Sequence, residues 1–270
     1  MMGRVIVVGS LNIDTVLRVA RHPRPGETVH ALGAESVPGG KGGNQAAAAA
    51  DAGAETVFIG AVGDDGARYL RHLQACGVDV SGVQRCTDIG TGAASVVVDD
   101  RGENSIIVVE GANGRVRAAQ LDALDLREGD VVSLQFELPD AVNAEVAARA
   151  SRRGATVLIN PSPWRESRTD VLALADVVIV NEIEAEQLGD VVSADVLCIT
   201  AGGAGARWGD LSAAAPRIEP VDTTGAGDRF AGTLAAMLAR GSTRQEALEH
   251  AVAAASEACL RHGAQQWRSV

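Results

Sequence analysis

The feature that most constrains the fold is a series of short apolar runs rich in β-branched residues, each followed by a polar residue or a glycine. The runs have the length of a strand and show no alternation of polar and apolar positions. That pattern is typical of strands with both faces buried in a parallel sheet. The runs are Val5–Val8, Val57–Ile59, Val131–Leu134, Val157–Ile159, Val177–Val180 and Val196–Ile199.

Ala-rich stretches of helical length lie between these runs, at Gln45–Ala52, Ala141–Arg153 and Phe230–Arg240. Strand–helix alternation predicts an α/β fold, with a mostly parallel central sheet and helices on both faces. The chain has 270 residues, of which 46% are hydrophobic, so it can build a substantial core. Because no internal repeat or linker interrupts it, we expect one domain over residues 1–270.

Two segments, near residues 12–37 and 90–110, break the alternation. The first contains Pro23, Pro25 and Gly26 beside half-polar, strand-like pieces. The second reads as a hairpin, with strands at Ala94–Val98 and Ser105–Val109 joined by a turn at Asp99–Gly102. A small antiparallel element attached to a parallel core can form a β-lid over a site. An ordinary extension of the sheet edge fits the pattern equally well.

The C-terminal part is predicted to form two helices. Gly241 is a suitable stop for the first. Thr243 and Glu246 have the spacing of a capping box, which opens the second helix. We expect Gly263 to end that helix.

Charge and composition exclude several classes of function. The formal net charge is -11, from 24 basic and 35 acidic residues, which argues against a nucleic-acid partner. No apolar run approaches the ~20 residues needed to cross a membrane, and no leader pattern is visible. The four cysteines match no zinc or CxxC pattern and are expected to be reduced thiols. These features favour a cytoplasmic protein without a membrane partner.

Polar residues that follow the apolar runs are the first candidates for a site, because ligands bind beyond the carboxyl ends of parallel strands. Each of them alone fits a turn or a helix cap, but together they place several carboxylates and amides at one sheet edge. They are Asn12, Asp14, Glu137, Asn160, Asn181, Glu184, Thr200 and Gly202.

The segment Asp222–Asp228, with the sequence DTTGAGD, precedes a predicted helix. Small residues at a helix start leave backbone N–H groups free to bind a phosphate or a developing oxyanion, helped by the helix dipole. Asp228 can cap the helix, or it can accept the proton of a hydroxyl group that attacks a phosphoryl group.

A second glycine cluster, Gly39–Gln45, has the sequence GGKGGNQ. It contains no GxxxxGK[ST] phosphate loop, and no GxGxxG motif follows Val5–Val8, which disfavours a nicotinamide-dependent oxidoreductase. Lys41 and Asn44 offer a cation and an amide that suit the hydroxyl groups of a polyol. A flexible loop with a solvated lysine is the alternative.

These residues resemble the ribokinase (phosphofructokinase-B) family of sugar kinases. Gly39–Gln45 and Gly60–Gly66 are similar to its first motif, Asp222–Asp228 to its second, and Asn181–Glu184 to its NxxE motif. The resemblance covers the chain from about Val5 to Gln265. It implies a three-layer α/β sandwich with a β-lid that closes over sugar, and a homodimer formed through that lid.

The resemblance also implies roles for individual residues. Asp228 would be the catalytic base, and the backbone of Gly225, Ala226 and Gly227 the anion hole. The sugar-binding positions are Asn12, Asp14, Gly39, Gly40, Lys41, Asn44, Glu137 and Asp228. The ATP-binding positions are Asn181, Thr200, Gly202, Gly205, Gly227 and His250, although His250 alone would more often be a helix-surface residue. Glu184 would hold Mg²⁺ through water, and a monovalent cation, which in the family is usually potassium, would be surrounded by Asp222, Thr224, Ala258 and Gly263.

The implied reaction transfers the γ-phosphoryl group of Mg·ATP to a primary hydroxyl, and the Gly39–Gln45 segment favours the 5-hydroxyl of D-ribose. A kinase of the same family for another sugar or a nucleoside, and a sugar- or nucleotide-binding protein without turnover, are the alternatives. Two positions depart from the family pattern. Arg229 follows the expected base, where smaller residues are commoner, and Trp267 lies near a frequent serine.

Overall fold

The computed structural model describes residues 2–165 and 169–268, and it contains a nine-stranded central sheet. The strand order is β13-β12-β11-β10-β9-β8-β1-β4-β5, and all neighbours are parallel except at β11–β12 and β12–β13. The strands are β1 (Val5–Val8), β4 (Thr56–Gly63), β5 (Val78–Cys86), β8 (Val131–Gln135), β9 (Thr156–Asn160), β10 (Val177–Asn181), β11 (Leu197–Thr200), β12 (Ala206–Trp208) and β13 (Leu211–Ala213).

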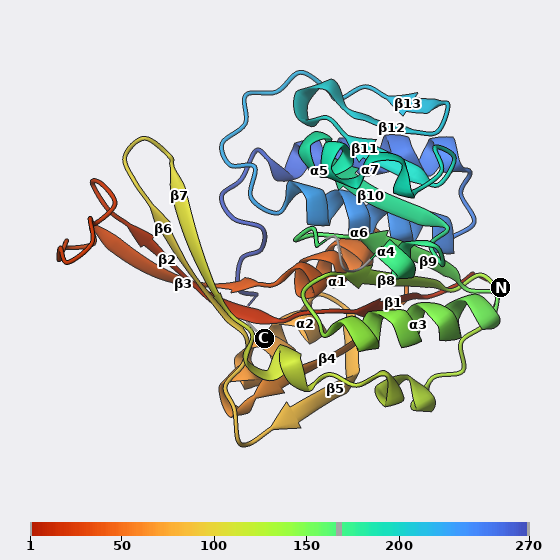
Figure 1. The fold of residues 1–270 in the computed structure, drawn as a ribbon, viewed down its shortest axis with the longest axis horizontal. Coiled ribbons are helices and arrows are strands. Elements are labelled where there is room, and N and C mark those ends of the chain that lie inside the picture. Colours follow the sequence, from red (N-terminus) through yellow and green to blue (C-terminus); the bar gives the residue numbers. More distant parts are fainter. Residues whose placement is uncertain (1, 166–168, 269–270) are drawn as a thin grey trace.

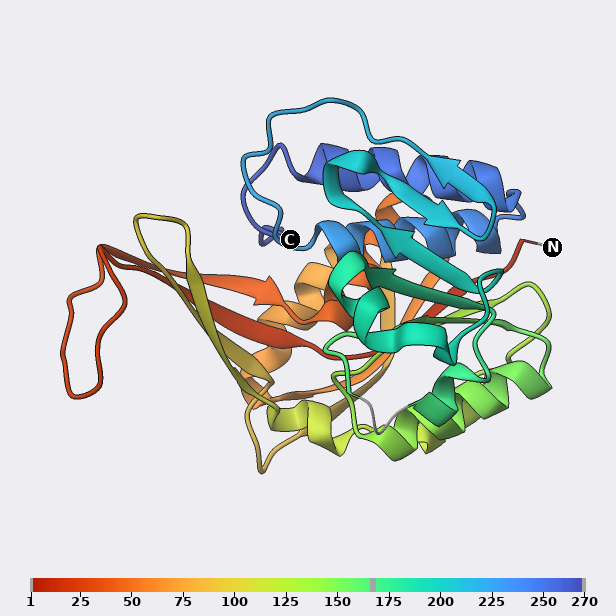
Figure 2. The same cartoon turned by 45° about the horizontal axis from the view of Figure 1, so that its top comes forward.

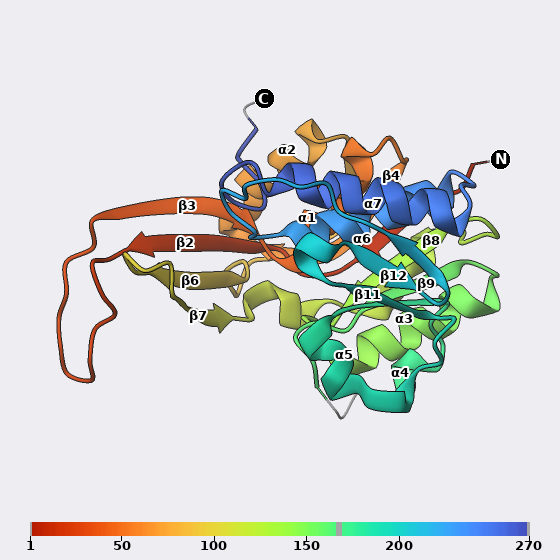
Figure 3. The same cartoon turned by 90° about the horizontal axis from the view of Figure 1, so that it is seen from above.

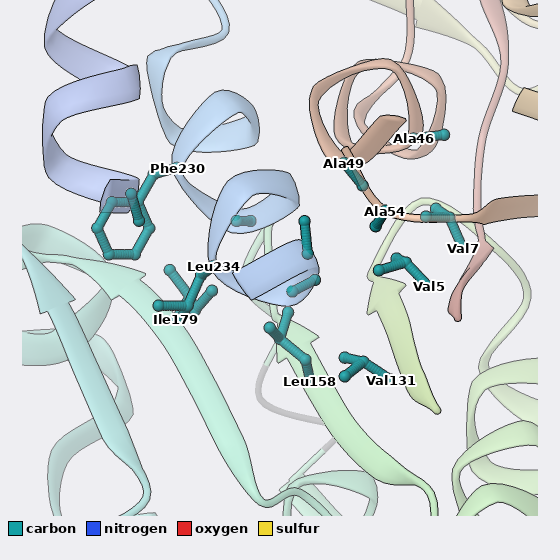
Figure 4. Close-up of a cluster of buried hydrophobic side chains, with 14 of the residues drawn as sticks. Val5, Val7, Ala46, Ala49, Ala54, Val131, Leu158, Ile179, Phe230 and Leu234 are labelled. Carbon is teal, nitrogen blue, oxygen red and sulfur yellow. The ribbon is translucent and has the colours of Figure 1, made fainter. Parts of the chain in front are cut away.

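The central strands are buried on both faces, as their unbroken apolar sequence predicts. In β1 the side chains of Val5 and Val7 belong to one hydrophobic cluster, whereas Ile6 and Val8 belong to the other. Successive side chains of a strand point to opposite faces, so one apolar run supplies both cores. Figure 4 shows the first cluster, where Val5 and Val7 face the side on which the Ala-rich helices pack.

Helices cover both faces of the sheet and complete the three layers (Figures 2 and 3). One face carries α1 (Lys41–Asp51), α2 (Ala67–Ala75), α6 (Ala226–Ala239) and α7 (Arg244–Ala258). The other carries α3 (Asp140–Arg152), α4 (Thr169–Leu172) and α5 (Glu182–Leu188). Single-turn helices η1 (Asp64–Gly66), η5 (Gly189–Val191) and η6 (Gly202–Ala204), with the longer η2 (Gly111–Arg115) and η3 (Ala118–Ala123), link these elements. The predicted α/β sandwich is confirmed.

A second, four-stranded sheet projects from the side of this body (Figure 1). Its order is β3-β2-β6-β7, with β2 (Asn12–Arg18), β3 (Gly33–Gly39), β6 (Ala93–Val98) and β7 (Asn104–Val109). It therefore unites the two segments that broke the alternation in the sequence. The predicted hairpin is β6–β7, and β2 pairs with both β3 and β6.

The end of α7 differs from the sequence-based expectation. The capping box of Thr243 and Glu246 opens α7 as predicted, but the helix ends at Ala258, with Cys259 as its C-cap, and not at Gly263. The Cys259 carbonyl accepts hydrogen bonds from the N–H groups of Val221 and Asp222, which come from the segment before α6. This tertiary pairing takes the place of a further helical turn.

All four cysteines have free thiols. Across residues 2–165 and 169–268, no helix combines the length and the apolar character needed to cross a membrane.

Candidate active site

The candidate site lies where the strand order turns. β1 is flanked by β4 and β8, and the chain leaves the carboxyl end of β1 directly into the projecting sheet. In an open α/β sheet this switch point opens a crevice beyond the carboxyl ends of the strands. Residues that follow β1, β8 and β10 meet there with the N-termini of α1 and α6.

Asp228 is the central carboxylate of this crevice. It lies in the first turn of α6, its residue is only 6% exposed, and both oxygens accept hydrogen bonds from side-chain amides of α1. Asn44 Nδ2 donates to Oδ2 over 2.9 Å, and Gln45 Nε2 donates to Oδ1 over 3.1 Å. The N-cap of α6 is Gly225, with φ of 76°, so capping is not the function of Asp228.

Gln45 is held in one orientation by buried partners on β8. Its Oε1 accepts hydrogen bonds from Ser133 Oγ at 2.8 Å and from Gln135 Nε2 at 2.7 Å, which turns its Nε2 toward Asp228. The same Nε2 also reaches Asn160 Oδ1 at 3.4 Å. A buried network of side chains from α1 and β8 thus holds the Asp228 carboxylate in one orientation.

Glu137 and Lys41 form a second group beside Asp228. Glu137 Oε2 accepts hydrogen bonds from Ser10 Oγ and, over 3.0 Å, from the backbone N–H of Lys41. Burial lowers the pKa of Lys41, but its attraction to Asp228, Glu137 and Glu184 outweighs burial and leaves the pKa raised. Lys41 is therefore a permanent cation among three carboxylates.

Asp14 lies on β2, at the base of the projecting sheet. Its Oδ1 accepts a 3.0 Å hydrogen bond from the Ala94 N–H of β6. Burial raises the pKa of Asp14 to about 6, and the nearby charge of Glu137 adds to the rise, against the lowering effect of the Ala94 bond. The last residue of β3 must be Gly39, because a Cβ there would lie 1.9 Å from Asp14 Oδ2.

Asn12 is buried, and its side chain is oriented by Asn113 of η2. Asn113 Nδ2 donates to Asn12 Oδ1 at 2.9 Å, and Asn113 Oδ1 accepts from the Leu11 N–H at 2.9 Å. The amide N–H₂ of Asn12 is thereby directed as a donor. Four sugar-binding predictions, Asn12, Asp14, Lys41 and Glu137, thus gather near Asn44 and Asp228 with the backbone of Gly39 and Gly40.

The residues predicted to bind ATP lie along the carboxyl ends of β10 and β11. Asn181 and Glu184 cap α5 reciprocally, with Asn181 Oδ1 accepting from the Glu184 N–H and Glu184 Oε2 accepting from the Asn181 N–H. Thr200 pairs with Asn181 in the sheet, and its hydroxyl donates to the Val180 carbonyl at 3.3 Å. Gly202 starts η6 and Gly205 is its C-cap.

His250 stands apart from this group. Its side chain is exposed on α7, and among the described residues it shares no hydrogen bond with the Asp228 cluster. The helix-surface position expected for an isolated histidine is what the structure shows.

Asp222 joins the segment before α6 to the segment after α7. Its Oδ1 accepts from the Thr224 N–H at 2.8 Å, and its Oδ2 accepts from the Gly263 N–H at 2.9 Å. Burial raises the pKa of Asp222. These hydrogen bonds and the charge of His262 lower it by a larger amount, so the net shift of the pKa is downward. Gly225, Ala258 and Gly263 line a cleft of about 380 Å³ beside it. The predicted cation-site residues are therefore neighbours.

The segment predicted to form the anion hole, and Arg229, lie next to Asp228 in the sequence. The N–H groups of Gly225, Ala226 and Gly227 begin α6, and in this structure the Ala226 N–H donates to the Thr223 carbonyl at 3.2 Å. The guanidinium of Arg229 pairs with Asp51 at the end of α1, at 2.5 Å. Its charge is thus engaged outside the Asp228 cluster.

Sequence reasoning did not identify several residues that orient the site. Gln45 lies inside the glycine motif, but nothing in the sequence indicated its bond to Asp228. Ser10 and Gln265 belong to irregular segments and Asn113 to the short helix η2, and none of them has a local sequence pattern. Ser10 lies two residues after the end of β1, so the rule that selected Asn12 also applies to it.

A buried carboxylate, a helix N-terminus and the nearby Lys41 cation suit a phosphotransferase with an alcohol group as acceptor. Residues 2–269 match the family model described as pfkB family carbohydrate kinase. The chain belongs to this family of carbohydrate kinases.

Individual relatives agree with that assignment. A ribokinase of Bacillus subtilis is 36% identical over 280 residues, covering 98% of this chain and 95% of the relative. The structure of a Cryptococcus neoformans ribokinase in complex with ADP superposes with a TM-score of 0.82 at 30% identity, covering 97% of this chain and 95% of that one. An Arabidopsis thaliana ribokinase complexed with ribose and ATP gives 0.84 at 27% identity, covering 97% and 94%.

Proposed function

We propose that this carbohydrate kinase transfers the γ-phosphoryl group of ATP to the 5-hydroxyl of D-ribose, with Asp228 as the base. The observation that carries the proposal is the buried Asp228 carboxylate, which two amides fix at the N-terminus of α6. The similarity to ribokinases, including one whose structure holds ribose and ATP, supports ribose as the acceptor.

The sugar would lie between the projecting sheet and the glycine segment. Asn12, Asp14 and Glu137 offer oriented hydrogen-bonding groups for its hydroxyls, and the Lys41 cation lies among them. The absence of side chains at Gly39 and Gly40 would let the backbone approach the sugar closely. Asn44 would contact both the sugar and Asp228. The β-lid strands would close over the bound sugar and exclude water.

In the reaction, Asp228 accepts the proton of the attacking hydroxyl as its oxygen approaches the γ-phosphorus in line. The leaving group is ADP. The N–H groups of Gly225 and Gly227, with the dipole of α6, would stabilise the charge on the transferred group. The Ala226 N–H would join them once it releases the Thr223 carbonyl. Thr200, Gly202, Gly205, Asn181 and His250 are proposed to hold the nucleotide.

The residues at the carboxyl end of β10 fit a magnesium ion. Mg²⁺ is usually held by one or two carboxylates together with substrate phosphates and water, and Glu184 is a half-buried carboxylate at that edge. When bound there, the ion would neutralise charge on the ATP phosphates. Within the described residues no cluster of three or more His, Cys, Asp or Glu could hold a metal by itself, so the proposed site would need the ATP phosphates and water as further ligands.

We further propose a monovalent cation, potassium, near Asp222. Its carboxylate already connects Thr224 and Gly263, and Ala258 and Gly263 line the same cleft. We also propose that two copies associate through the projecting sheet.

The test is ADP release from Mg·ATP with ribose, 2-deoxyribose, fructose, adenosine and 2-keto-3-deoxygluconate, each with and without potassium. We expect ribose to give the highest kcat/KM and potassium to raise it. Highest turnover with another acceptor would refute ribose and keep the mechanism. If ATP raised the thermal stability of the protein but no acceptor led to ADP release, a binding protein without turnover would be favoured instead.

A further inference from the structure

The hydrogen bonds around Asp228 continue beyond Asn44 into the segment that follows α7. Asn44 Oδ1 accepts a 2.7 Å hydrogen bond from Gln265 Nε2. Gln265 Oε1 in turn lies 2.8 Å from His72 Nε2 on α2, and His72 is only 2% exposed. A chain of side chains from three parts of the sequence therefore leads to the proposed base.

The charge of Asp228 fixes the direction of every bond in this chain. An ionised carboxylate only accepts hydrogen bonds, so the Asn44 N–H₂ must face Asp228 and its Oδ1 must face away. That oxygen requires a donor, which places the Gln265 N–H₂ against it. The Gln265 Oε1 then requires a donor from His72.

His72 meets this requirement in one tautomer. Its Nδ1 accepts a 2.9 Å hydrogen bond from the backbone N–H of Arg268, so the ring proton resides on Nε2 and points at Gln265. The same imidazole therefore binds the C-terminal segment at two points. It couples the position of that segment to the orientation of the Gln265 amide.

Aromatic packing anchors the segment at the same place. The Trp267 ring stands edge-on to Tyr69 and His72, with centroid distances of 5.7 and 5.4 Å. The Arg68 guanidinium lies over the Trp267 ring, 4.2 Å from its centroid. The indole Nε1 of Trp267 donates a 2.7 Å hydrogen bond to the Ser36 carbonyl of β3. Residue Gln265 is thus held between α2 and the projecting sheet.

We infer that Gln265 and His72 are positioning residues for phosphoryl transfer, which act through Asn44 to keep its amide N–H on Asp228. Without Gln265, the Asn44 oxygen loses the side chain that donates to it, and the amide can rotate away from the carboxylate. Asp228 then loses one of the two bonds that orient its lone pairs toward the acceptor hydroxyl. This inference rests on the proposal that Asp228 is the base.

The first test compares Gln265→Met with Gln266→Met in the kinase assay. Methionine keeps the length of glutamine but not its hydrogen bonds, and Gln266 is an exposed neighbour on the same segment. We expect kcat to fall about tenfold in Gln265→Met, with KM for ATP unchanged and Gln266→Met like the parent. Equal kcat values for the two variants would overturn the inference.

The second test distinguishes polarity from packing at position 72. His72→Gln retains a donor for Gln265 and an acceptor for the Arg268 N–H, whereas His72→Phe retains only the ring. Circular dichroism first verifies that both variants are folded. We then expect kcat to fall about fivefold in His72→Phe and to stay close to the parent value in His72→Gln. A loss that follows ring shape, so that Phe outperforms Gln, would overturn the inference.

An Asp228→Asn variant separates this inference from the proposed function. Near-normal kcat in that variant would refute Asp228 as the base. A severe loss there, combined with normal kcat in the Gln265→Met and His72→Phe variants, would refute only the positioning role.

Discussion

The side-chain amide of Gln45 donates a 3.1 Å hydrogen bond to Asp228 Oδ1 while its own oxygen accepts from Ser133 and Gln135. The core of the sheet and the carboxylate proposed to be the base are therefore linked through a single side chain. Asn44 supplies the matching bond to Oδ2 from the preceding position of the same helix. Two consecutive residues of α1 thus hold both oxygens of Asp228.

Replacing Gln45 should reduce both stability and turnover. In Gln45→Met, the hydroxyl of Ser133 and the amide of Gln135 lose a buried partner, which we expect to cost about 2 kcal/mol in free energy of unfolding. Loss of the bond to Asp228 should lower kcat about tenfold. Urea unfolding and steady-state kinetics measure the two effects, with Gln74→Met, at an exposed helical glutamine, as the control. Unchanged stability of Gln45→Met would contradict the network described.

Asp14 should make stability depend on pH in a defined direction. Burial raises its folded pKa to about 6 from an ordinary value of 3.8, so the folded state holds the proton more tightly than the unfolded chain. The contribution of Asp14 to stability is therefore greatest below pH ~4. It declines as the pH rises from the unfolded pKa of 3.8 to the folded pKa of about 6, and it is lost above that pH.

Asp14→Asn removes this dependence and keeps an acceptor for the Ala94 N–H. We expect it to raise the free energy of unfolding by about 1–2 kcal/mol at pH 7.5 and to change it little at pH 4. The same variant should bind sugar more weakly, because a neutral amide replaces a carboxylate that accepts from hydroxyls. Thermal unfolding at the two pH values is the measurement, and an equal shift at both would show that Asp14 is not the cause.

The outer strand of the projecting sheet should mediate association. Ile106, Ile107, Val108 and Val109 of β7 are 56 to 68% exposed, an unusual density of apolar side chains for a surface. We expect Ile107→Glu to weaken the dimer at least tenfold in sedimentation velocity. Ile183→Glu is a matched control, since Ile183 is also 68% exposed but lies on α5. A parent chain that sediments as a monomer at all concentrations would refute the dimer.

The parallel strands could be predicted because each is buried on both faces and so has an unbroken apolar sequence. Edge elements lack this property. β5 (Val78–Cys86) alternates buried and exposed residues, and β12 and β13 have three residues each, so none of them was predicted. Helix α2 also went unpredicted, since arginines and a histidine interrupt its apolar positions.

The site divides in the same way. Residues within motifs, such as Lys41, Asn44 and Asp228, could be predicted as a group. Their supports could not, because the partners are far apart in sequence. Gln265 lies 221 residues from Asn44, and Asn113 lies 101 residues from Asn12. No local spacing connects such pairs, and only the folded topology brings them together.

The most direct test of the account is the kcat of Asp228→Asn with Mg·ATP and ribose, beside calorimetric binding of each ligand. Asparagine keeps the shape of the side chain but cannot take the hydroxyl proton. We predict a fall in kcat of roughly 10²- to 10⁴-fold with both ligands still bound. Turnover within a few-fold of the parent would contradict the assignment of Asp228 as the base.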